Sequence, residues 1–472
     1  MKRIKPSPPA INTFYEQAGK LVSDALEKHD MKPIQIGSGG EFPYSYATPD
    51  VNFYLKTWEY LNRNLEEVKD TDRLAFGEPL TNQYLKYYNL LGYQLSAEDS
   101  KKLDAAKETA QEVSSELVKE YERLYGKITP EMMTKAEVAN KQDYILDYKV
   151  NSWAKNGHFV LSDETLDNLE DFLPKMPSSA RVLIPLIGKS LQPYLAVSGI
   201  VNRIYQADSE IRNVKKNAEH PNEANNGVIT EDDHRKTAYH AGIDVEPGPK
   251  QIDTRLKGDN KVSVHLSFSN FAEKEADLQI EGQAGGRINL FSVLTISTES
   301  GTSYSLHELN TSFEECSVTL TYGGPTAVYI KPRPYQVDSA TGWFYLSPIK
   351  DAIDNGPDPT KSGFVMTPYP SDGGIKVLQY LVISRFPSFR ISYSRGSTSE
   401  SLEKLHSESS VSVNLFGIPL GSAGYEYKST SLEKRSENEG FDIVFETPMD
   451  VTGNILDRRA HVIGGGITSL TP

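Results

Sequence analysis

Residues 97–126 read AEDSKKLDAAKETAQEVSSELVKEYERLYG and residues 261–271 read KVSVHLSFSNF, and the contrast between these two stretches decides the fold. Apolar residues recur in the first stretch at intervals of three and four: Leu103, Ala106, Ala110, Val113, Leu117, Tyr121 and Leu124. That spacing places them along one stripe of an α-helix, as in a coiled-coil seam. The second stretch alternates apolar and polar residues, which is typical of a half-buried β-strand. The chain is therefore predicted to be an α+β protein.

The helical stretch has recognisable ends. Ser96 is placed to cap its first turn, Gly126 ends it, and Pro130 begins a second helical pattern that runs to residue 156. Two long helices joined by about four residues must fold back on each other. The sequence thus predicts a long antiparallel helical hairpin over residues 97–156.

This hairpin is expected to form the centre of a helical domain over residues 1–206. Its seam is predicted to be lined by four residues that face the opposite helix: Leu103, Val113, Leu117 and Leu124. The hairpin either packs within a helical bundle or drives assembly into an oligomer. A third hypothesis, in which it swings out toward a membrane, is disfavoured by the many Glu and Lys residues of its polar face.

The remainder of the chain divides into a linker and a β domain. Residues 207–260 are polar and contain several Asn, Pro and Gly, so they are predicted to be a linker or long exposed loop. Residues 261–472 contain short alternating runs separated by Gly, Pro, Asn and Asp. Such a pattern favours an antiparallel β domain resembling a β-sandwich.

Within the β domain, residues 384–450 stand out as a Ser-rich strand pair flanked by Ser/Glu-rich arms. Apolar side chains alternate with Ser, Asn, Glu and Lys in its two strands: Val411, Val413, Leu415, Tyr425 and Tyr427. One hypothesis makes this pair a polar edge hairpin whose serines face water. The other makes it a pore-forming hairpin, with one wet face and one lipid face. These five residues are the candidate contacts to a membrane or a partner.

Composition excludes some classes of function. The net charge is −14, from 50 Lys and Arg against 64 Asp and Glu, and no basic cluster appears, which argues against nucleic-acid binding. The single cysteine, Cys316, allows no internal disulfide, and its acidic neighbours would not activate a thiol.

The start of the sequence bears on localisation. Residues 1–17 are basic but lack the apolar core of a signal peptide. We therefore expect a soluble protein made without a cleavable signal, either cytoplasmic or released by a non-classical route. The apolar segment 182–205 contains Pro185, Lys189, Pro193 and Arg203, so it is predicted to be a buried, kinked helix pair rather than a membrane span.

No motif predicts catalysis, a cofactor or a metal. His234 and His240, in EDDHRKTAYH, have a spacing that fits neither a one-faced helix pair nor a zinc finger. The glycines of GSGG (37–40) and GGGITS (464–469) lack the Lys-Ser/Thr pair of a phosphate-binding loop. Nor is there a nucleophile motif with its supporting residues.

The leading hypothesis is therefore a non-enzymatic, toxin-like protein that acts on a membrane or binds a protein receptor, using its β region for recognition or insertion. Two alternatives remain open. One is a structural or assembly protein that forms homo-oligomers through the helical hairpin. The other is an enzyme of an unrecognised type.

Overall fold

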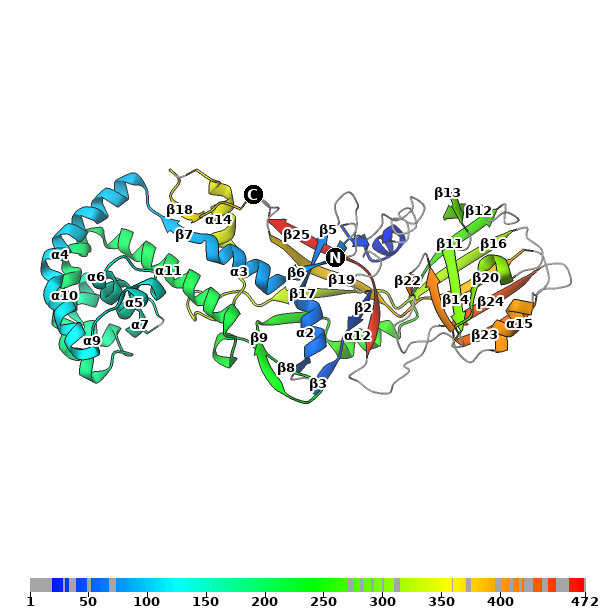
Figure 1. The fold of residues 1–472 in the computed structure, drawn as a ribbon, viewed down its shortest axis with the longest axis horizontal. Coiled ribbons are helices and arrows are strands. Elements are labelled where there is room, and N and C mark those ends of the chain that lie inside the picture. Colours follow the sequence, from blue (N-terminus) through cyan, green and yellow to red (C-terminus); the bar gives the residue numbers. More distant parts are fainter. Residues whose placement is uncertain are drawn as a thin grey trace.

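The structure is a computed structural model, and it describes residues 19–28, 30–33, 40–48, 52–67, 74–155, 157–269, 275–280, 283–289, 293–298, 301–309, 315–358, 360–370, 375–394, 400–407, 411–415, 418–419, 428–434, 440–446 and 458–470. Helices and antiparallel sheets together make up the molecule, which confirms the α+β class. Three regions follow one another along an elongated shape: a helical region, a central region built on a sheet, and a β region at the far end (Figure 1). The buried apolar residues form three hydrophobic cores along this shape, and residues of the central sheet and of α11 also contribute to the cores of neighbouring regions.

The longest helix of the described residues, α4 (Ala97–Tyr125), begins and ends where the sequence predicts. The Ser96 hydroxyl oxygen accepts a hydrogen bond from the Asp99 backbone N–H at 3.1 Å, which satisfies one of the free donors of the first turn. Gly126 follows the last turn with φ of 87°, in the left-handed region that favours glycine. One face of α4 is buried in the helical region: Leu103, Ala106, Ala110, Ser114, Leu117 and Tyr121.

Two of the predicted seam residues lie less deep than expected. Val113 and Leu124 are only half-buried, whereas Leu103 and Leu117 lie in the core. Ser114 takes the inward position beside Val113, and its hydroxyl donates to the Ala110 carbonyl at 2.8 Å. A small side chain bonded to its own helix lets the neighbouring elements approach closely without leaving a buried polar group unpaired.

The second arm of the predicted hairpin is broken into short helices rather than continuous. It consists of α5 (Pro130–Lys135), α6 (Lys141–Asp143), a π-helix (Tyr144–Lys149) and α7 (Val150–Trp153). Glu137 adopts a positive φ of 57°, which stops α5, and the Asn140 side chain then caps α6 by accepting from the Asp143 N–H at 2.9 Å. The main partners of α4 are instead α10 (Ile184–Leu191) and the 3-10 helix after it.

The other helices complete the core of the helical region. They are α8 (Asp163–Asp167), α9 (Leu169–Phe172), a 3-10 helix (Ser178–Leu183), α10, a second 3-10 helix (Gln192–Val197) and α11 (Ser198–Glu219). Pro185 and Pro193 each occupy the first turn of a new helix, so residues 182–205 form a chain of short helices that leads into α11. Among the helices that the structure describes, none is both long enough and apolar enough to cross a membrane.

The central region is built on an antiparallel sheet that joins the two ends of the chain. Its strands, in spatial order, are β1 (Lys32–Pro33), β25 (Arg459–Leu470), β19 (Ile375–Ser384), β17 (Thr326–Pro332) and β10 (Ile243–Glu246), and β2 (Glu41–Pro43) also pairs with β25. Strands β1 and β2, near the start of the sequence, each pair with β25, so this sheet contains strands from both sides of the predicted division at residues 206 and 261.

Helices from distant parts of the sequence pack into the core of this sheet: α2 (Leu55–Asn62), α3 (Leu80–Leu90), α12 (Pro249–Leu256) and α14 (Ser347–Asn355). Three small sheets complete the region. The first has the order β3 (Tyr46–Thr48), β4 (Asn52–Tyr54), β8 (Val228–Glu231) and β9 (Thr237–His240). The second pairs β5 (Arg63–Glu67) with β6 (Leu74–Pro79), and the third pairs β7 (Leu91–Gln94) with β18 (Gly363–Met366).

Residues 207–260, predicted to be a linker, are instead mostly regular structure. They contain the second half of α11, the strands β8, β9 and β10, and helix α12. The strands have only four residues each, too few for a clear alternation, and β10 gains its stability from pairing with β17, far along the chain. Local composition therefore carries little information on this segment.

The glycines of GGGITS lie within β25 rather than in a loop. A side chain at Gly464 would place its Cβ 2.5 Å from the Lys32 carbonyl oxygen on β1, and one at Gly466 would meet the Tyr380 ring on β19. These glycines allow two neighbouring strands to approach β25 closely, which is a packing role.

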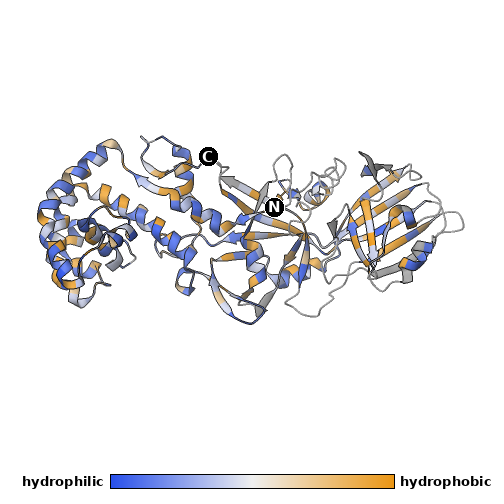
Figure 2. Ribbon diagram, viewed as in Figure 1, coloured by the Kyte–Doolittle hydropathy of each residue, from blue (hydrophilic) through white to orange (hydrophobic). Residues whose placement is uncertain are grey.

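Strands of two sheets contribute residues to the core of the β region. The larger has the order β13 (Gln283–Asn289), β12 (Glu275–Ile280), β11 (Lys261–Ser269), β16 (Cys316–Gly323), β20 (Ser388–Tyr393), β24 (Phe441–Glu446) and β23 (Lys428–Lys434). The smaller has the order β15 (Ser303–Ser305), β14 (Leu294–Thr298), β21 (Val411–Leu415) and β22 (Ile418–Pro419), and α15 (Glu400–Ser407) lies nearby. Apolar residues recur along the strands of this region, while α4 is largely hydrophilic (Figure 2).

The Ser-rich segment 384–450 does not form one strand pair among its described residues. Strand β21 pairs with β14 in the smaller sheet, whereas β23 pairs with β24 in the larger sheet. Residues 411–415 thus belong to the smaller sheet and residues 428–434 to the larger, while residues 421–427 of the predicted second strand lie outside the described residues. Strand β21 pairs with β14, which lies far earlier in the sequence, a pairing that the local alternation cannot reveal, whereas β23 and β24 are neighbours along the chain.

Candidate functional site

The predicted contact residues of β21 face the interior of the β region. Val411, Val413 and Leu415 are 1%, 2% and 1% exposed and belong to its core. Ser412 and Asn414, between them, point to the other face, opposite Ser297 and Thr295 of β14. The three apolar side chains could reach a membrane or a receptor only after β21 separates from the core. Tyr425 and Tyr427 lie outside the described residues.

The outer face of the larger sheet carries hydroxyl groups at successive positions. Ser263 on β11 and Thr321 on β16 lie with their hydroxyl oxygens 3.0 Å apart, and His265 Nδ1 lies 2.9 Å from the Thr319 hydroxyl. Farther across the sheet, Arg390 pairs with Asp442 at 2.9 Å. This face is polar, largely uncharged along β11 and β16, and rich in groups that can both donate and accept hydrogen bonds.

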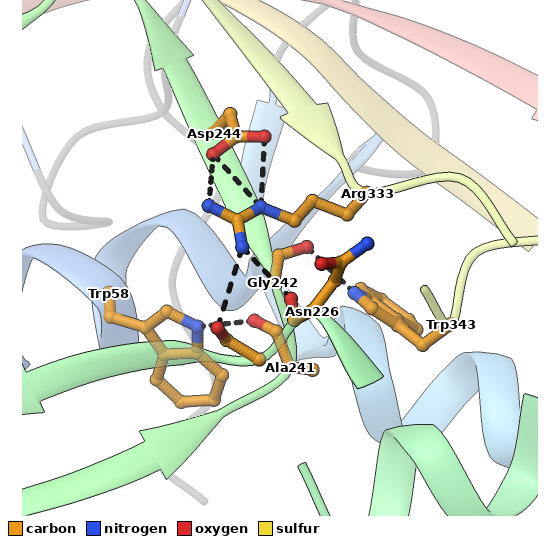
Figure 3. A network of polar contacts seen from close by, with 8 residues as sticks. Trp58, Asn226, Ala241, Gly242, Asp244, Arg333 and Trp343 are labelled. Carbon is orange, nitrogen blue, oxygen red and sulfur yellow. Dashed lines mark hydrogen bonds and ion pairs between the residues drawn. The ribbon is translucent and has the colours of Figure 1, made fainter. Parts of the chain in front are cut away.

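A network around Arg333 joins three segments of the central region (Figure 3). The Arg333 guanidinium forms a bidentate ion pair with Asp244 on β10, at 2.9–3.1 Å, and donates to the Asn226 carbonyl at 3.0 Å. Nearby, the indole N–H groups of Trp58 and Trp343 donate to the carbonyls of Ala241 and Gly242 at 2.9 and 2.7 Å. The donors of this network are directed at protein carbonyls and a carboxylate, so its role is structural.

The histidines of EDDHRKTAYH do not come together as a metal site. The His240 ring packs against the Trp58 ring with centroids 4.2 Å apart, and burial lowers the pKa of His240. Asp233 forms an ion pair with Lys56 at 2.9 Å, and the Asp232 carboxylate accepts from the backbone N–H groups of His234 and Lys236. Within the part of the chain that the structure describes, no group of three His, Cys, Asp or Glu residues is arranged to hold a metal ion.

A pocket lies where the helical region meets the central region. Its volume is about 250 Å³, and its walls come from three separate segments. Helix α11 supplies Gln206, Ser209, Glu210 and Asn213; the segment between α7 and α8 supplies His158; and the segment after β17 supplies Tyr335. The pocket is thus assembled from residues nearly 180 positions apart in the sequence.

Glu210 is the most deeply buried charged group of this pocket, at 6% exposure. Its carboxylate accepts from Gln206 Nε2 at 2.9 Å and from the Tyr345 hydroxyl. Burial raises the pKa of Glu210, and these two hydrogen bonds only partly oppose the shift. The ion pairs formed by the described residues include none with Glu210, so among these residues no cation pairs with this carboxylate.

His158 faces the same pocket with one ring nitrogen unpaired. Its Nδ1 is buried and has no hydrogen-bond partner. Burial lowers the pKa of His158, with a smaller contribution from the nearby positive charge of Arg212, while a hydrogen bond to the Tyr205 backbone acts in the opposite direction. The imidazole is therefore neutral near pH 7 and adds no positive charge beside Glu210.

A second buried polar group lies inside the helical region, on the π-helix. The Tyr205 hydroxyl donates to the Asp147 carboxylate at 2.7 Å. Burial, together with the negative charge of Asp143, raises the pKa of Asp147 to about 7. Its carboxyl group can therefore gain or lose a proton near neutral pH, which affects the stability of the helical region rather than an open site.

Sequence reasoning missed the pocket because Glu210 lies in the stretch predicted to be a linker. One signal could have found it: Ala207, Ile211 and Val214 continue the four- and three-residue spacing of a buried helix face, and Glu210 sits within it. His158 and Tyr335 offer no comparable signal. A scan against family models, a search of curated proteins and a search of solved structures each found no match to this chain.

Proposed function

We propose that this is a non-enzymatic, toxin-like protein that acts on membranes through its β region. The observation that carries the proposal is the two-faced character of β21 and β14, whose inward residues are apolar apart from Thr298 and whose outward residues are Ser, Thr and Asn. Strands of this kind can exchange a protein core for lipid on one face while the other face stays in water. The same hydroxyl-rich pattern continues on the outer face of β11 and β16.

The mechanism that we propose begins with release of β21 from the core. Val411, Val413 and Leu415 would then leave their buried positions, at a cost of about 1.5–3 kcal/mol for each side chain, or roughly 5–9 kcal/mol together. Contact with the hydrocarbon of a bilayer would restore a similar amount. Without a membrane, this cost keeps β21 in its sheet, so the soluble form is stable until a target is met.

The proposal needs no catalytic group. Cys316, the only thiol, is 1% exposed in the core of the β region, and burial raises its pKa, so it is a poor nucleophile. The Ser209 hydroxyl in the pocket donates to the Gly157 backbone carbonyl at 3.3 Å rather than to a base.

The test compares two disulfide tethers that share one residue. Ser297 on β14 lies opposite both Ser412 on β21 and Ser303 on β15. Residues directly opposite in antiparallel strands have Cα atoms about 4.5–5.5 Å apart, within the range that a disulfide spans. The pair S297C/S412C locks β21 to β14, while the control pair S297C/S303C leaves β21 free. Cys316 can remain, because its thiol is buried.

Dye leakage from liposomes is the measurement. We expect leakage by the wild type and the oxidised control pair, none by the oxidised S297C/S412C protein, and recovery of leakage after reduction. Full leakage by the oxidised S297C/S412C protein would refute release of β21. If the wild type caused no leakage from neutral or anionic vesicles, the membrane proposal itself would fail.

A second candidate, assembly through the helical region, is favoured by exposed apolar side chains there. Tyr125, Val160 and Val182 are 43%, 48% and 56% exposed. Light scattering of the wild type against a V160S/V182S variant tests this candidate. A particle mass that is several times that of one chain and falls in the variant would support assembly, and a single-chain mass at high concentration would exclude it.

A further inference from the structure

We propose that the pocket between α11 and the segment after β17 binds a small aliphatic amine in its cationic form. The volume of about 250 Å³ equals the space of roughly eight water molecules. A ligand of six to eight non-hydrogen atoms would therefore fill it. This inference is independent of the membrane proposal, because the pocket is formed by α11, the segment around His158 and the segment after β17 rather than by the β region.

The walls of the pocket are rich in acceptors. Gln206 Nε2 is directed at Glu210, and Asn213 Nδ2 donates to the Ser209 hydroxyl at 3.2 Å and to the Tyr335 hydroxyl at 3.4 Å. With these nitrogens directed at the protein, the amide oxygens remain to accept, and no donor among the described residues bonds either of them. A ligand that supplies several N–H donors complements such a surface, and an ammonium group supplies three.

Charge favours a cation over a neutral molecule. The Glu210 carboxylate is buried and forms no ion pair with a described Lys or Arg, which is costly unless a ligand neutralises it. Asp338 adds a second carboxylate to the lining, and His158 is neutral near pH 7. Arg212, the nearby cation, acts on His158 but forms no ion pair with Glu210. The ring of Tyr335, 6% exposed, offers a π face that also attracts an ammonium group.

Three probes of the same chain length separate charge from size. Isothermal titration of the full chain with 1,4-diaminobutane should give saturable binding, with a Kd between about 1 µM and 1 mM. The neutral 1,4-butanediol and the anionic butanedioate should bind at least about tenfold more weakly, because they cannot neutralise Glu210. Equal binding of all three probes, or no binding of the diamine, would overturn the proposal.

Matched variants locate the site. E210Q keeps the size of the side chain but removes its charge, and should weaken diamine binding by about 10-fold to 100-fold. The control E219Q changes an exposed carboxylate on the same helix and should leave the Kd unchanged. If both variants weakened binding equally, the diamine would be attracted by the net charge of −14 and not by this pocket.

A steric variant tests the site without changing Glu210, in case E210Q alters the fold. Val337 lines the pocket and is 42% exposed, so V337W should obstruct the entrance without touching the carboxylate. We expect V337W to lose diamine binding while retaining the wild-type circular dichroism spectrum. Unchanged binding by V337W would place the diamine elsewhere and refute the site.

The pH dependence gives a further check. Lowering the pH protonates Glu210, whose pKa is raised, and charges His158, whose pKa is lowered, so both changes oppose a cationic ligand. Asp338 and Arg212 are the other charged groups near the ligand. The Kd should therefore rise from pH 8 to pH 5, more steeply in the wild type than in E210Q. A Kd that falls over this range would contradict the assignment of a cationic ligand.

Discussion

Replacement of Leu117 by Ala should destabilise the helical region by about 3–4 kcal/mol. Leu117 has no exposed surface and contacts the core shared by α4 and α10. The change removes three carbon atoms, each worth about 0.8 kcal/mol of burial, and the cavity that remains adds about 1–2 kcal/mol. Ala is as good a helix former as Leu, so the loss arises from packing and not from the helix itself.

Urea unfolding followed by circular dichroism at 222 nm measures this loss. With a slope of about 2 kcal/mol per M, the midpoint of the helical transition should fall by roughly 1.5–2 M. Because the molecule has several cores, this transition need not coincide with unfolding of the β region.

Two neighbours on α4 serve as controls. Glu116 is exposed, so E116A should change stability by no more than about 0.5 kcal/mol. Val113 is half-buried, so V113A should cost about 1 kcal/mol. If V113A cost as much as L117A, the predicted seam would be right and the observed inward position of Ser114 would be wrong. A midpoint of L117A within error of E116A would refute the buried position of Leu117.

Three further predictions concern other parts of the molecule. The folded-state pKa of Asp147 is about 7, above its usual value near 4, so the folded protein should lose stability as the pH rises from about 4 to 7. D147N should abolish this dependence and raise stability at pH 8 by about 2–4 kcal/mol. Thermal melts at pH 4 and pH 8, with the exposed D104N as control, can check this. Arg333→Lys cannot keep both the bidentate pair with Asp244 and the bond to the Asn226 carbonyl, so chemical denaturation should show a loss of about 1.5–3 kcal/mol, and an unchanged stability would contradict the structural role of this network. Arg235 adopts a φ of 60° in the turn between β8 and β9, so R235G should increase stability by about 0.5–1 kcal/mol. The melting temperature should rise accordingly, and a lower melting temperature would contradict the left-handed geometry.

Features that rest on local sequence were predictable. The ends of α4 follow from Ser96 and Gly126, and β11 follows from its alternation, because caps and periodicity act within a few residues. The second hairpin arm was not predictable to the same degree. The apolar residues of 130–156 suit a continuous helix, yet Glu137 and Asn140 interrupt it so that the chain can pack around α4 and α10.

The features missed from the sequence all depend on distant partners. Val411, Val413 and Leu415 alternate as expected, but only the pairing of β21 with β14 shows that the apolar face points inward. Within the polar stretch 207–260, β10 pairs with β17 and β8 pairs with β4, and the pocket forms only when α11 meets the segments around His158 and Tyr335. Such contacts leave no periodic trace in any one stretch.

The pairing of β2 with β25 sets the order of events during synthesis. Residues 41–43 find their partners at residues 459–461, so more than 400 residues must be made before this part of the sheet can close. At 5–20 residues per second, the early strands wait roughly 20–80 s on the ribosome. The helical region, whose contacts are local, can fold during that interval. The central sheet instead closes only after β25 has been made and inserts between β1 and β19, and a chain released before residue 459 would leave both strands without their shared neighbour.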